Sequence, residues 1–476
     1  MRFTRPAECR GFGLVAVTAF PPISAMPDTP TAIALPLDRP ALEAACLRAL
    51  DIARERGASD AEAEASAAVG QSVTVRLAEV ETVEYNRDKG LSVTVYFGQR
   101  RGNASTSDVS DAAIAQAVDA ACAIARHTAP DPAAGLPDED RLYRGSAPDL
   151  DLWHPWQLGV EPAIELARAA EAAARAVDRR IANSEGATVS SWDSDFVFAN
   201  SRGFLGGYPG SRASIGCGVI AVEGDAMQRD AWYASERDPA RLESAEHVGR
   251  RAGERAIARL GARRVPTAEV PVLFEATVAG SLVGHLVSAA SGSSLYRRSS
   301  FLENAAGKEI FAPLVNLHED PFKPGGMASG WFDAEGVATS ARDIVKDGVL
   351  TGYFLSSYSA RKLGLPTTGN AGGCHNLDLR PGDDDFEALL RRLGRGLLVT
   401  ELMGQGVNPV TGDYSRGAAG FWVEGGEIRF PVEEVTIAGN LLAMYRGIVA
   451  VGSDVLVRGS RSTGSILVDR MTVAGH

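Results

Sequence analysis

Apolar side chains recur at helical spacing in five stretches of the chain. In the first stretch, from about residue 41 to 54, Leu42, Cys46 and Ala49 fall on one face of a helix that Gly57 ends. The other stretches are a segment that follows Ser110 and segments near 161–178, 240–260 and 278–290. The pattern therefore predicts five helices within the first 290 residues.

Between these helices, apolar and polar residues alternate as they do in half-buried strands. Val73 and Val75 alternate with polar neighbours, residues 91–97 repeat the pattern, and the polar segment 86–90 between them predicts a hairpin turn. Short strands punctuated by glycine are expected over 187–235. The beginning of the chain is therefore predicted to form a small α/β layer.

Strand and turn signals are densest in the C-terminal half. Segments 346–348 and 424–427 carry the Asp-Gly and Gly-Gly pairs that are typical of hairpins. We therefore expect an α+β protein, in which an α/β N-terminal region is followed by a β-rich C-terminal domain.

Breaks in these patterns suggest domain boundaries. Residues 128–160 are rich in proline and lack periodicity, which is typical of a linker. The predicted parts are a disordered leader at 1–38, a first α/β domain at 39–130, a linker at 131–160, a middle domain at 161–262 and a β-rich domain at 263–476. Arginines and a short apolar stretch within residues 1–25 also leave a secretion signal as the alternative to a leader.

Composition narrows the possible partners. The net charge is -12. Because a negatively charged chain repels phosphate backbones, nucleic acid is not an expected partner. No stretch of about 20 apolar residues occurs, so we expect no membrane span. The five cysteines are scattered and never paired as CxxC, which favours a reducing, cytoplasmic compartment.

Short motifs give no convincing catalytic centre. His318-Glu319 begins an HExxH string, but Pro321 disturbs a helix there and the second histidine is missing, so a loop histidine is expected. Cys374 and His375 are adjacent, and adjacent residues rarely converge on one metal ion. Ser359 opens an SxxK pattern without its companion motifs, which favours an exposed helix turn over a serine nucleophile.

A glycine-rich polar segment at 404–420 is the most unusual local feature. Small residues let one backbone approach another closely. The segment therefore suits a strand edge that receives an extended peptide, or a tight corner of a barrel, and the composition leaves both readings open.

The same region carries a resemblance to a known family. Residues 406–441, which begin GVNPVTGDYSRGAAGFW, resemble the C-terminal signature of the PmbA (TldE) branch of the TldD/PmbA protease family. Residues 79–90, 183–187 and 336–364 are similar to other parts of the family, in the right order. The resemblance covers the chain from about residue 40 to the end.

This resemblance implies a fold and an activity. It implies a barrel-like C-terminal domain and a heterodimer with a TldD-like catalytic subunit that degrades or trims unfolded peptides. Known substrate types in the family are a microcin precursor and a labile antitoxin, and an older family label is modulator of DNA gyrase. The acidic charge gives no support to direct contact with DNA.

The resemblance also implies that this chain lacks the zinc site. The catalytic branch carries HExxxH and a distant cysteine ligand, whereas Gly284, His285 and Ala289 occupy the motif positions here. Residues 448–452 contain no cysteine. We therefore expect no cofactor on this chain and a zinc ion on the TldD-like partner, with His285 a packed residue.

The resemblance and the glycine-rich segment together suggest where peptide binds. The predicted peptide-binding residues are Asn408, Thr411, Tyr414, Ser415, Arg416 and Phe421. An alternative is a stand-alone peptide-binding or chaperone-like module, which would form a homodimer or larger homo-oligomer in isolation.

Overall fold

The computed structural model describes residues 34–475. The predicted leader therefore lies outside the described residues except for 34–38. Asp38 caps the first helix, α1 (Arg39–Glu55), because its carboxylate accepts a hydrogen bond of 3.0 Å from the amide of Ala41. None of the described helices combines the length and the apolar character needed to cross a membrane.

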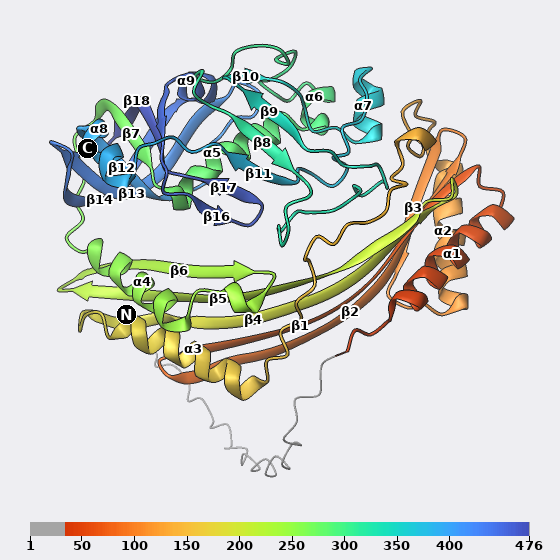
Figure 1. The fold of residues 1–476 in the computed structure, drawn as a ribbon, viewed down its shortest axis with the longest axis horizontal. Helices are drawn as coiled ribbons and strands as arrows, with labels where there is room; N and C mark the ends of the chain where they lie inside the picture. The colour runs from red at the N-terminus through yellow and green to blue at the C-terminus, as the bar shows by residue number, and fades with distance from the viewer. Residues whose placement is uncertain (1–33, 476) are drawn as a thin grey trace, which may run out of the picture. The chain divides into compact units, whose positions relative to one another are not determined.

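One long antiparallel sheet dominates the first half of the chain (Figure 1). Its strands, in spatial order, are β3 (Arg100–Thr106), β2 (Glu79–Phe97), β1 (Asp60–Arg76), β4 (Ile181–Asn200), β5 (Leu205–Glu223) and β6 (Ala226–Glu236). The predicted first and middle domains thus contribute strands to a single sheet, in which β1 pairs with β4 over 14 residue pairs from Glu62↔Asn200 to Val75↔Ala187.

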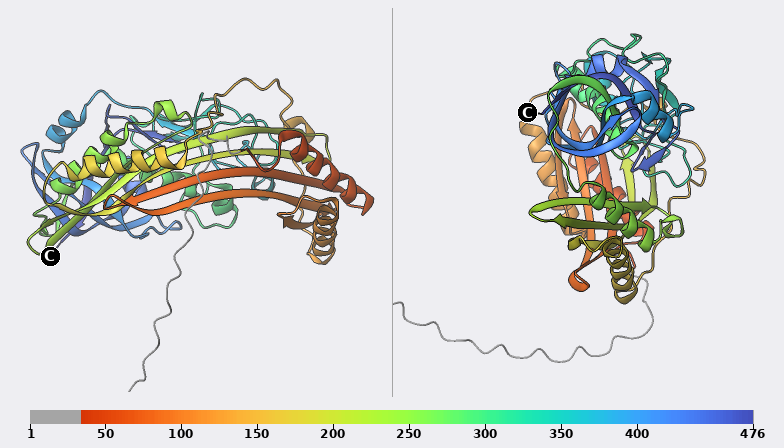
Figure 2. Two further views of the ribbon diagram at one scale, coloured as in Figure 1. Left: turned by 90° about the horizontal axis from the view of Figure 1, so that it is seen from below. Right: turned by 90° about the vertical axis from the view of Figure 1, so that its left-hand side faces the viewer.

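Four helices cover one face of this sheet. They are α1, α2 (Asp111–His127), α3 (Val160–Arg175) and α4 (Ala245–Ala258). Odd-numbered residues of β1 point to them: Ala61 and Ala65 pack with α1 and α2, and Val73 and Val75 pack with α3 and α4. The opposite face turns towards the C-terminal domain (Figures 1 and 2).

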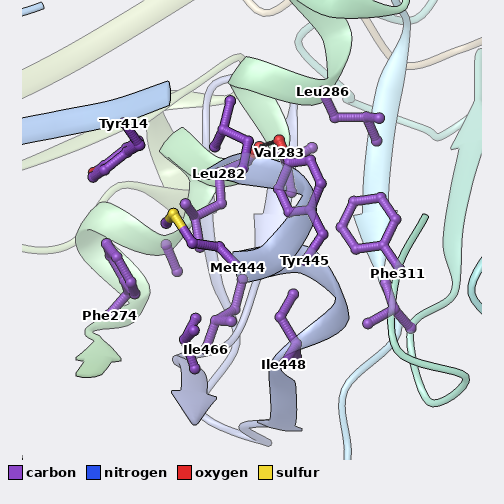
Figure 3. Close-up of a cluster of buried hydrophobic side chains, with 14 of the residues drawn as sticks. Phe274, Leu282, Val283, Leu286, Phe311, Tyr414, Met444, Tyr445, Ile448 and Ile466 are labelled. Carbon is purple, nitrogen blue, oxygen red and sulfur yellow. Dashed lines mark hydrogen bonds between the residues drawn. The ribbon is translucent and has the colours of Figure 1, made fainter. Parts of the chain in front are cut away.

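The C-terminal domain contains a closed five-stranded barrel. The ring runs β14 (Glu427–Asn440), β13 (Asp413–Glu424), β12 (Arg395–Met403), β7 (Ala268–Phe274) and β18 (Ile466–Ala474), and β18 pairs back to β14. Helix α5 (Ala276–Ala289) follows β7 and packs Leu282, Val283 and Leu286 into the same core as Tyr445 (Figure 3). The Tyr445 hydroxyl donates a 3.0 Å hydrogen bond to the Leu282 carbonyl, which satisfies a buried polar group.

A smaller mixed sheet lies beside the barrel. Its order is β10 (Val349–Leu350), β9 (Arg342–Lys346), β8 (Leu317–Asp320), β11 (Asn376–Leu379), β17 (Arg461–Thr463) and β16 (Leu456–Arg458). The remaining elements are β15 (Ile448–Val451), α6 (Gly292–Tyr296), α7 (Ser357–Leu363), α8 (Phe386–Leu393), α9 (Leu441–Arg446) and the 3-10 helices η1 (Glu139–Arg141) and η2 (Pro239–Arg241).

Most of the expected elements are present. The five predicted helices correspond to α1 to α5, and the hairpins at 346–348 and 424–427 join β9 to β10 and β13 to β14. The α+β class with a barrel-like C-terminal domain is confirmed. The short strands expected over 187–235 are wrong, because this stretch belongs to three strands of 11 to 20 residues.

The predicted hairpin turn at 86–90 is also wrong. Those residues lie inside β2, and the chain reverses instead at Leu77 and Ala78, which both have positive φ angles, 52° and 66°. The carboxylate of Glu171 accepts hydrogen bonds of 2.8 and 2.7 Å from the amides of these two residues. A residue from α3 therefore stabilises a turn that has no glycine or asparagine of its own.

Candidate functional site

The outward side of α5 faces a cavity of about 460 Å³. Small residues, Gly280, Ser281 and Gly284, let other elements approach the helix closely. The cavity is lined by α5, by the adjoining ends of β12 and β13, by the β16–β17 hairpin, and by residues 230–233 of β6. It therefore lies between the barrel and the edge strand of the long sheet.

The β16–β17 hairpin places two arginines in this cavity. Arg458 and Arg461 are paired across the hairpin, whose turn contains Gly459 with a φ of +61°. The Arg458 guanidinium lies over the rings of Trp232 and Tyr233, 4.6 and 4.1 Å from their centroids, and donates a 2.7 Å hydrogen bond to the Tyr233 carbonyl.

Arg461 lies directly against α5. A Cβ atom placed on Gly284 would be 3.1 Å from Nη1 of Arg461 and 3.3 Å from its Cζ. Glycine at this position lets the guanidinium lie this close to the helix, because a Cβ atom would make it move by a few tenths of an ångström.

Strand β13 adds Tyr414 and Arg416 on the same side. The ring of Tyr414 meets that of His285 edge to face, with centroids 5.8 Å apart. Within the described residues, several buried polar atoms here have no hydrogen-bond partner: the Tyr414 hydroxyl, His285 Nε2, Arg416 Nε, Arg461 Nε and Thr400 Oγ1. Buried polar groups without partners are uncommon in folded proteins, and a bound water or ligand would pair them.

The charges of the site are only partly balanced. Arg255 pairs with Asp230 and Glu275, at 3.1 and 3.0 Å, and Arg259 pairs with Asp230 and Glu401. Over residues 34–475, no carboxylate lies within 4.0 Å of the guanidinium groups of three further arginines, namely Arg416, Arg458 and Arg461. The cavity is therefore locally positive in an acidic chain.

His285 responds to this environment. Burial is the main cause that lowers the pKa of its imidazole, and the positive charges of Arg416 and Arg461 lower it further. The imidazole is therefore neutral at pH 7.

A zinc ion does not fit this set of side chains. The family motif positions are Gly284, His285 and Ala289, and Ala289 is buried in the core of the domain. Within residues 34–475, no group of three His, Cys, Asp or Glu side chains is arranged to hold a metal ion. Two guanidinium groups beside His285 would also repel a cation.

The structure brings together only part of the predicted peptide-binding set. Arg416 lines the cavity, and Tyr414 is buried in the core of the domain against His285. Phe421 packs on the other side of β13 against α8. Asn408 and Thr411 lie in the exposed turn before β13, where the Asn408 side chain accepts hydrogen bonds from the amides at 410 and 411. Ser415 is exposed, and its amide pairs with the Gly406 carbonyl.

The short motifs have structural roles. Ser359 is buried and forms a capping box with Ser356 at the start of α7, so the expected exposed turn is wrong for this residue. Lys362 bonds to Asp131 at 2.8 Å instead. His318 lies in strand β8 rather than in a loop, where it contacts a carboxylate.

The Cys374–His375 pair also has structural contacts. His375 contacts the carbonyl oxygens of Ala328 and Gly369. Cys374 is a free, partly buried thiol that packs against the core of the C-terminal domain.

Family models match three consecutive parts of the chain. They are described as PmbA/TldA metallopeptidase domain 1 at 61–125, central domain at 153–260 and C-terminal domain at 267–475. The chain is 49% identical to metalloprotease PmbA of Escherichia coli O157:H7, over 92% of this chain and 97% of the relative. The chain belongs to the PmbA/TldD metallopeptidase family, PmbA (TldE) branch.

Other members of the PmbA/TldD family support this assignment. The PmbA homolog of Haemophilus influenzae is 46% identical to this chain, over 90% of this chain and 95% of the homolog. The TldD homolog of the same organism is only 23% identical, over 77% of this chain and 80% of the homolog. A solved Bacteroides thetaiotaomicron protein named as a modulator of DNA gyrase superposes with a TM-score of 0.86 at 28% identity, covering 91% of this chain and 99% of that one.

Sequence reasoning missed the arginines of the β16–β17 hairpin. Their signal was present as the string Arg458-Gly459-Ser460-Arg461, which places two arginines on either side of a two-residue turn. Nothing in the string shows that it meets a helix about 175 residues earlier, so only the structure could connect them.

Proposed function

We propose that this chain is the non-catalytic subunit of a two-subunit zinc peptidase. In this proposal it pairs with a TldD-like subunit, helps to enclose that subunit's zinc site and holds unfolded peptide in an extended form. The observation that carries the proposal is α5, where the family's motif positions hold Gly284, His285 and Ala289 and the guanidinium of Arg461 lies against the helix. The fold of TldE from Thermococcus kodakarensis, with a TM-score of 0.79 at 21% identity over 90% of this chain and 99% of that one, is consistent with it.

Open strand edges support the handling of extended peptide. Strand β6 pairs only with β5, and β16 pairs only with β17, among the strands of the described residues. Both edges border the cavity beside α5. An extended peptide can add to such an edge through main-chain hydrogen bonds, which only an unfolded chain can offer.

The proposal also includes a cellular compartment and a substrate class. Cys46, Cys122 and Cys217 are buried free thiols, which suits a reducing compartment, and we assign the chain to the cytoplasm. The proposed substrates are unfolded peptides of the microcin-precursor or antitoxin type. The net charge of -12 supports neither nucleic acid nor an anionic surface as a partner.

Reconstitution with a cognate TldD-like subunit tests the proposal. We expect an unstructured peptide to be cleaved only when both chains are present, and a chelator to abolish cleavage. Metal analysis should find zinc with the TldD-like subunit and in the complex. The matched control replaces the glutamate of the partner's HExxxH motif with glutamine, which should abolish cleavage while the complex still forms.

Two results would contradict the proposal. Chelator-sensitive cleavage by this chain alone would show that it carries its own catalytic centre. If a homodimer of this chain binds peptide and forms no complex with a TldD-like subunit, the result would favour the stand-alone module instead.

A further inference from the structure

The cavity beside α5 contains more positive charge than its own residues balance. Arg416, Arg458 and Arg461 line it and have no carboxylate within 4.0 Å among residues 34–475, whereas the acidic residues of the lining, Asp230 and Glu401, pair with Arg255 and Arg259. We call the part of the cavity bounded by Arg416, Arg458, Arg461 and α5 the cationic pocket.

We propose that the cationic pocket binds the C-terminal carboxylate of an extended peptide. The inference rests on the proposed function, in which the chain handles unfolded peptides. It assigns a recognition role to the side of α5 that carries Gly284, one of the motif positions.

Unpaired donors point to an anionic ligand with several oxygen atoms. Arg416 and Arg461 line the cavity, and each has an Nε–H group without a hydrogen-bond partner among the described residues. Guanidinium groups bind carboxylates through two parallel hydrogen bonds, and such charge-assisted bonds are stronger than neutral ones. A carboxylate in the cavity would supply the counter-charge that the guanidinium groups of Arg416, Arg458 and Arg461 lack among the described residues.

The surroundings of the pocket favour a peptide over a free inorganic anion. Apolar side chains are exposed along the two open edges: Tyr233 on β6 is 46% exposed, and Val457 on β16 is 53% exposed. Leu402, at the end of β12, also lines the cavity. A small anion would use none of this apolar surface, whereas a peptide that ends in the pocket would pack its last side chains against it.

The glycines of α5 make the pocket possible. Gly280 and Gly284 lie one turn apart on the side of the helix that meets the hairpin, and the nearest atoms to a Cβ on either glycine belong to Arg461 or Thr463. A Cβ atom on Gly284 would be 3.1 Å from Nη1 of Arg461, so a side chain there would shift the guanidinium. Gly284, which stands at a position of the family motif, therefore leaves room for Arg461.

A pair of peptides tests the proposal on the full chain. The two peptides share one unstructured sequence of eight residues and differ only in a free C-terminal carboxylate or a C-terminal amide. We expect calorimetry to show that the acid binds about tenfold to a hundredfold more tightly, the ratio expected for hydrogen bonds to a charged group. Inorganic phosphate at millimolar concentration should not displace the acid peptide.

Variants connect this preference to the pocket. Arg461→Gln and Arg416→Gln should each reduce the acid-to-amide ratio towards one, with little change in binding of the amide peptide. Arg470→Gln is the matched control, because this arginine lies on β18 of the same domain, is 70% exposed and should leave the ratio unchanged. Circular dichroism of each variant shows whether it is folded before binding is measured.

Three outcomes would overturn the inference. They are equal binding of acid and amide, displacement of the acid peptide by phosphate at millimolar concentration, and no binding of either peptide. Failure of this kind is separable from failure of the proposed function, because peptide cleavage by the complex with the TldD-like subunit is measured independently.

Discussion

At the scale of single residues, His285 shows how far the environment of α5 departs from that of a metal site. A histidine ligand needs a neutral imidazole, but it also needs neighbours that tolerate a cation. His285 has the first property, since burial and two arginines lower its pKa, and it lacks the second. Its Nε2 atom is buried without a partner among residues 34–475. The residue is therefore a sensitive reporter of the positive charge around it.

The pKa of His285 gives a direct prediction. In the wild-type chain we expect the imidazole to titrate below its ordinary value of about 6.5. Arg461→Gln should raise that pKa, because it removes one of the positive charges that disfavour the imidazolium form. The measurement is a long-range nitrogen–proton NMR titration, assigned with a His285→Gln sample.

The sign of the pH effect on stability follows from the same shift. A folded-state pKa below the unfolded-state value means that the unfolded chain binds more protons, so this residue lowers the free energy of unfolding as the pH falls below about 6.5. An unchanged pKa in both Arg461→Gln and Arg416→Gln would contradict the electrostatic account. Arg470→Gln is the control that should not move it, because Arg470 is exposed and is not among the charges that lower the pKa of His285.

The sequence predicted part of this site and could not predict the rest. Gly284, His285 and Ala289 could be compared with the family motif because they lie in one continuous stretch. Arg461 could not be added, since its position depends on β17 pairing with β11 in the small sheet. Arg416 was predicted to bind peptide at a strand edge, and in the structure it lines a positively charged cavity.

At the scale of elements, the contact between α3 and α4 depends on the absence of side chains. Helix α3 presents Ala163, Ala167 and Ala170 to the core, and α4 presents Gly249 and Gly253. A Cβ on Gly249 would lie 1.8 Å from the carbonyl oxygen of Ala170. The two helices therefore lie so close that their backbones nearly touch.

Alanine at two helical glycines should have opposite effects. Gly249→Ala should lower the free energy of unfolding by about 1–3 kcal/mol, since the added methyl group forces the helices apart. Gly280→Ala is the matched control, because the nearest atom to its Cβ is 3.8 Å away and alanine favours a helix by about 1 kcal/mol over glycine. Urea denaturation measures both, and a Gly249→Ala chain as stable as the wild type would contradict the close packing.

The misplaced hairpin turn shows why local patterns failed for one element. Residues 86–90 have the polar, glycine-containing composition of a turn, yet they form an exposed stretch of β2. The true turn at Leu77 and Ala78 is stabilised by Glu171, more than 90 residues later in the chain. Helical periodicity, in contrast, depends on neighbouring residues alone, so α1 to α5 were predicted correctly, whereas the shorter helices α6 to α9 were not placed.

At the scale of the whole described chain, an aromatic cluster joins the long sheet to the C-terminal domain. Phe332 of the C-terminal domain is buried among rings from the sheet, 4.9 Å from the centroid of Phe204 and 5.6 Å from that of Tyr208. Trp331 meets Tyr208 edge to face at 4.9 Å. The cluster is formed by the sheet face that the four helices leave open.

Removing Phe332 should weaken the coupling between the two parts without unfolding either. Phe332→Ala leaves a cavity among rings from the sheet and from the C-terminal domain. We therefore expect the free energy of unfolding to fall by about 3–5 kcal/mol. Each part keeps its own apolar core, since the barrel residues and the sheet residues form separate clusters. Calorimetry should therefore show the thermal transition broaden or split.

Phe322→Ala is the matched control for that experiment. Phe322 is an aromatic residue of the same domain that is 38% exposed, and its loss should change the profile little. If both variants melt like the wild type, the aromatic cluster does not couple the two parts. A split confined to Phe332→Ala would mean that this cluster couples the unfolding of the long sheet to that of the C-terminal domain, the two parts that also form the walls of the cavity beside α5.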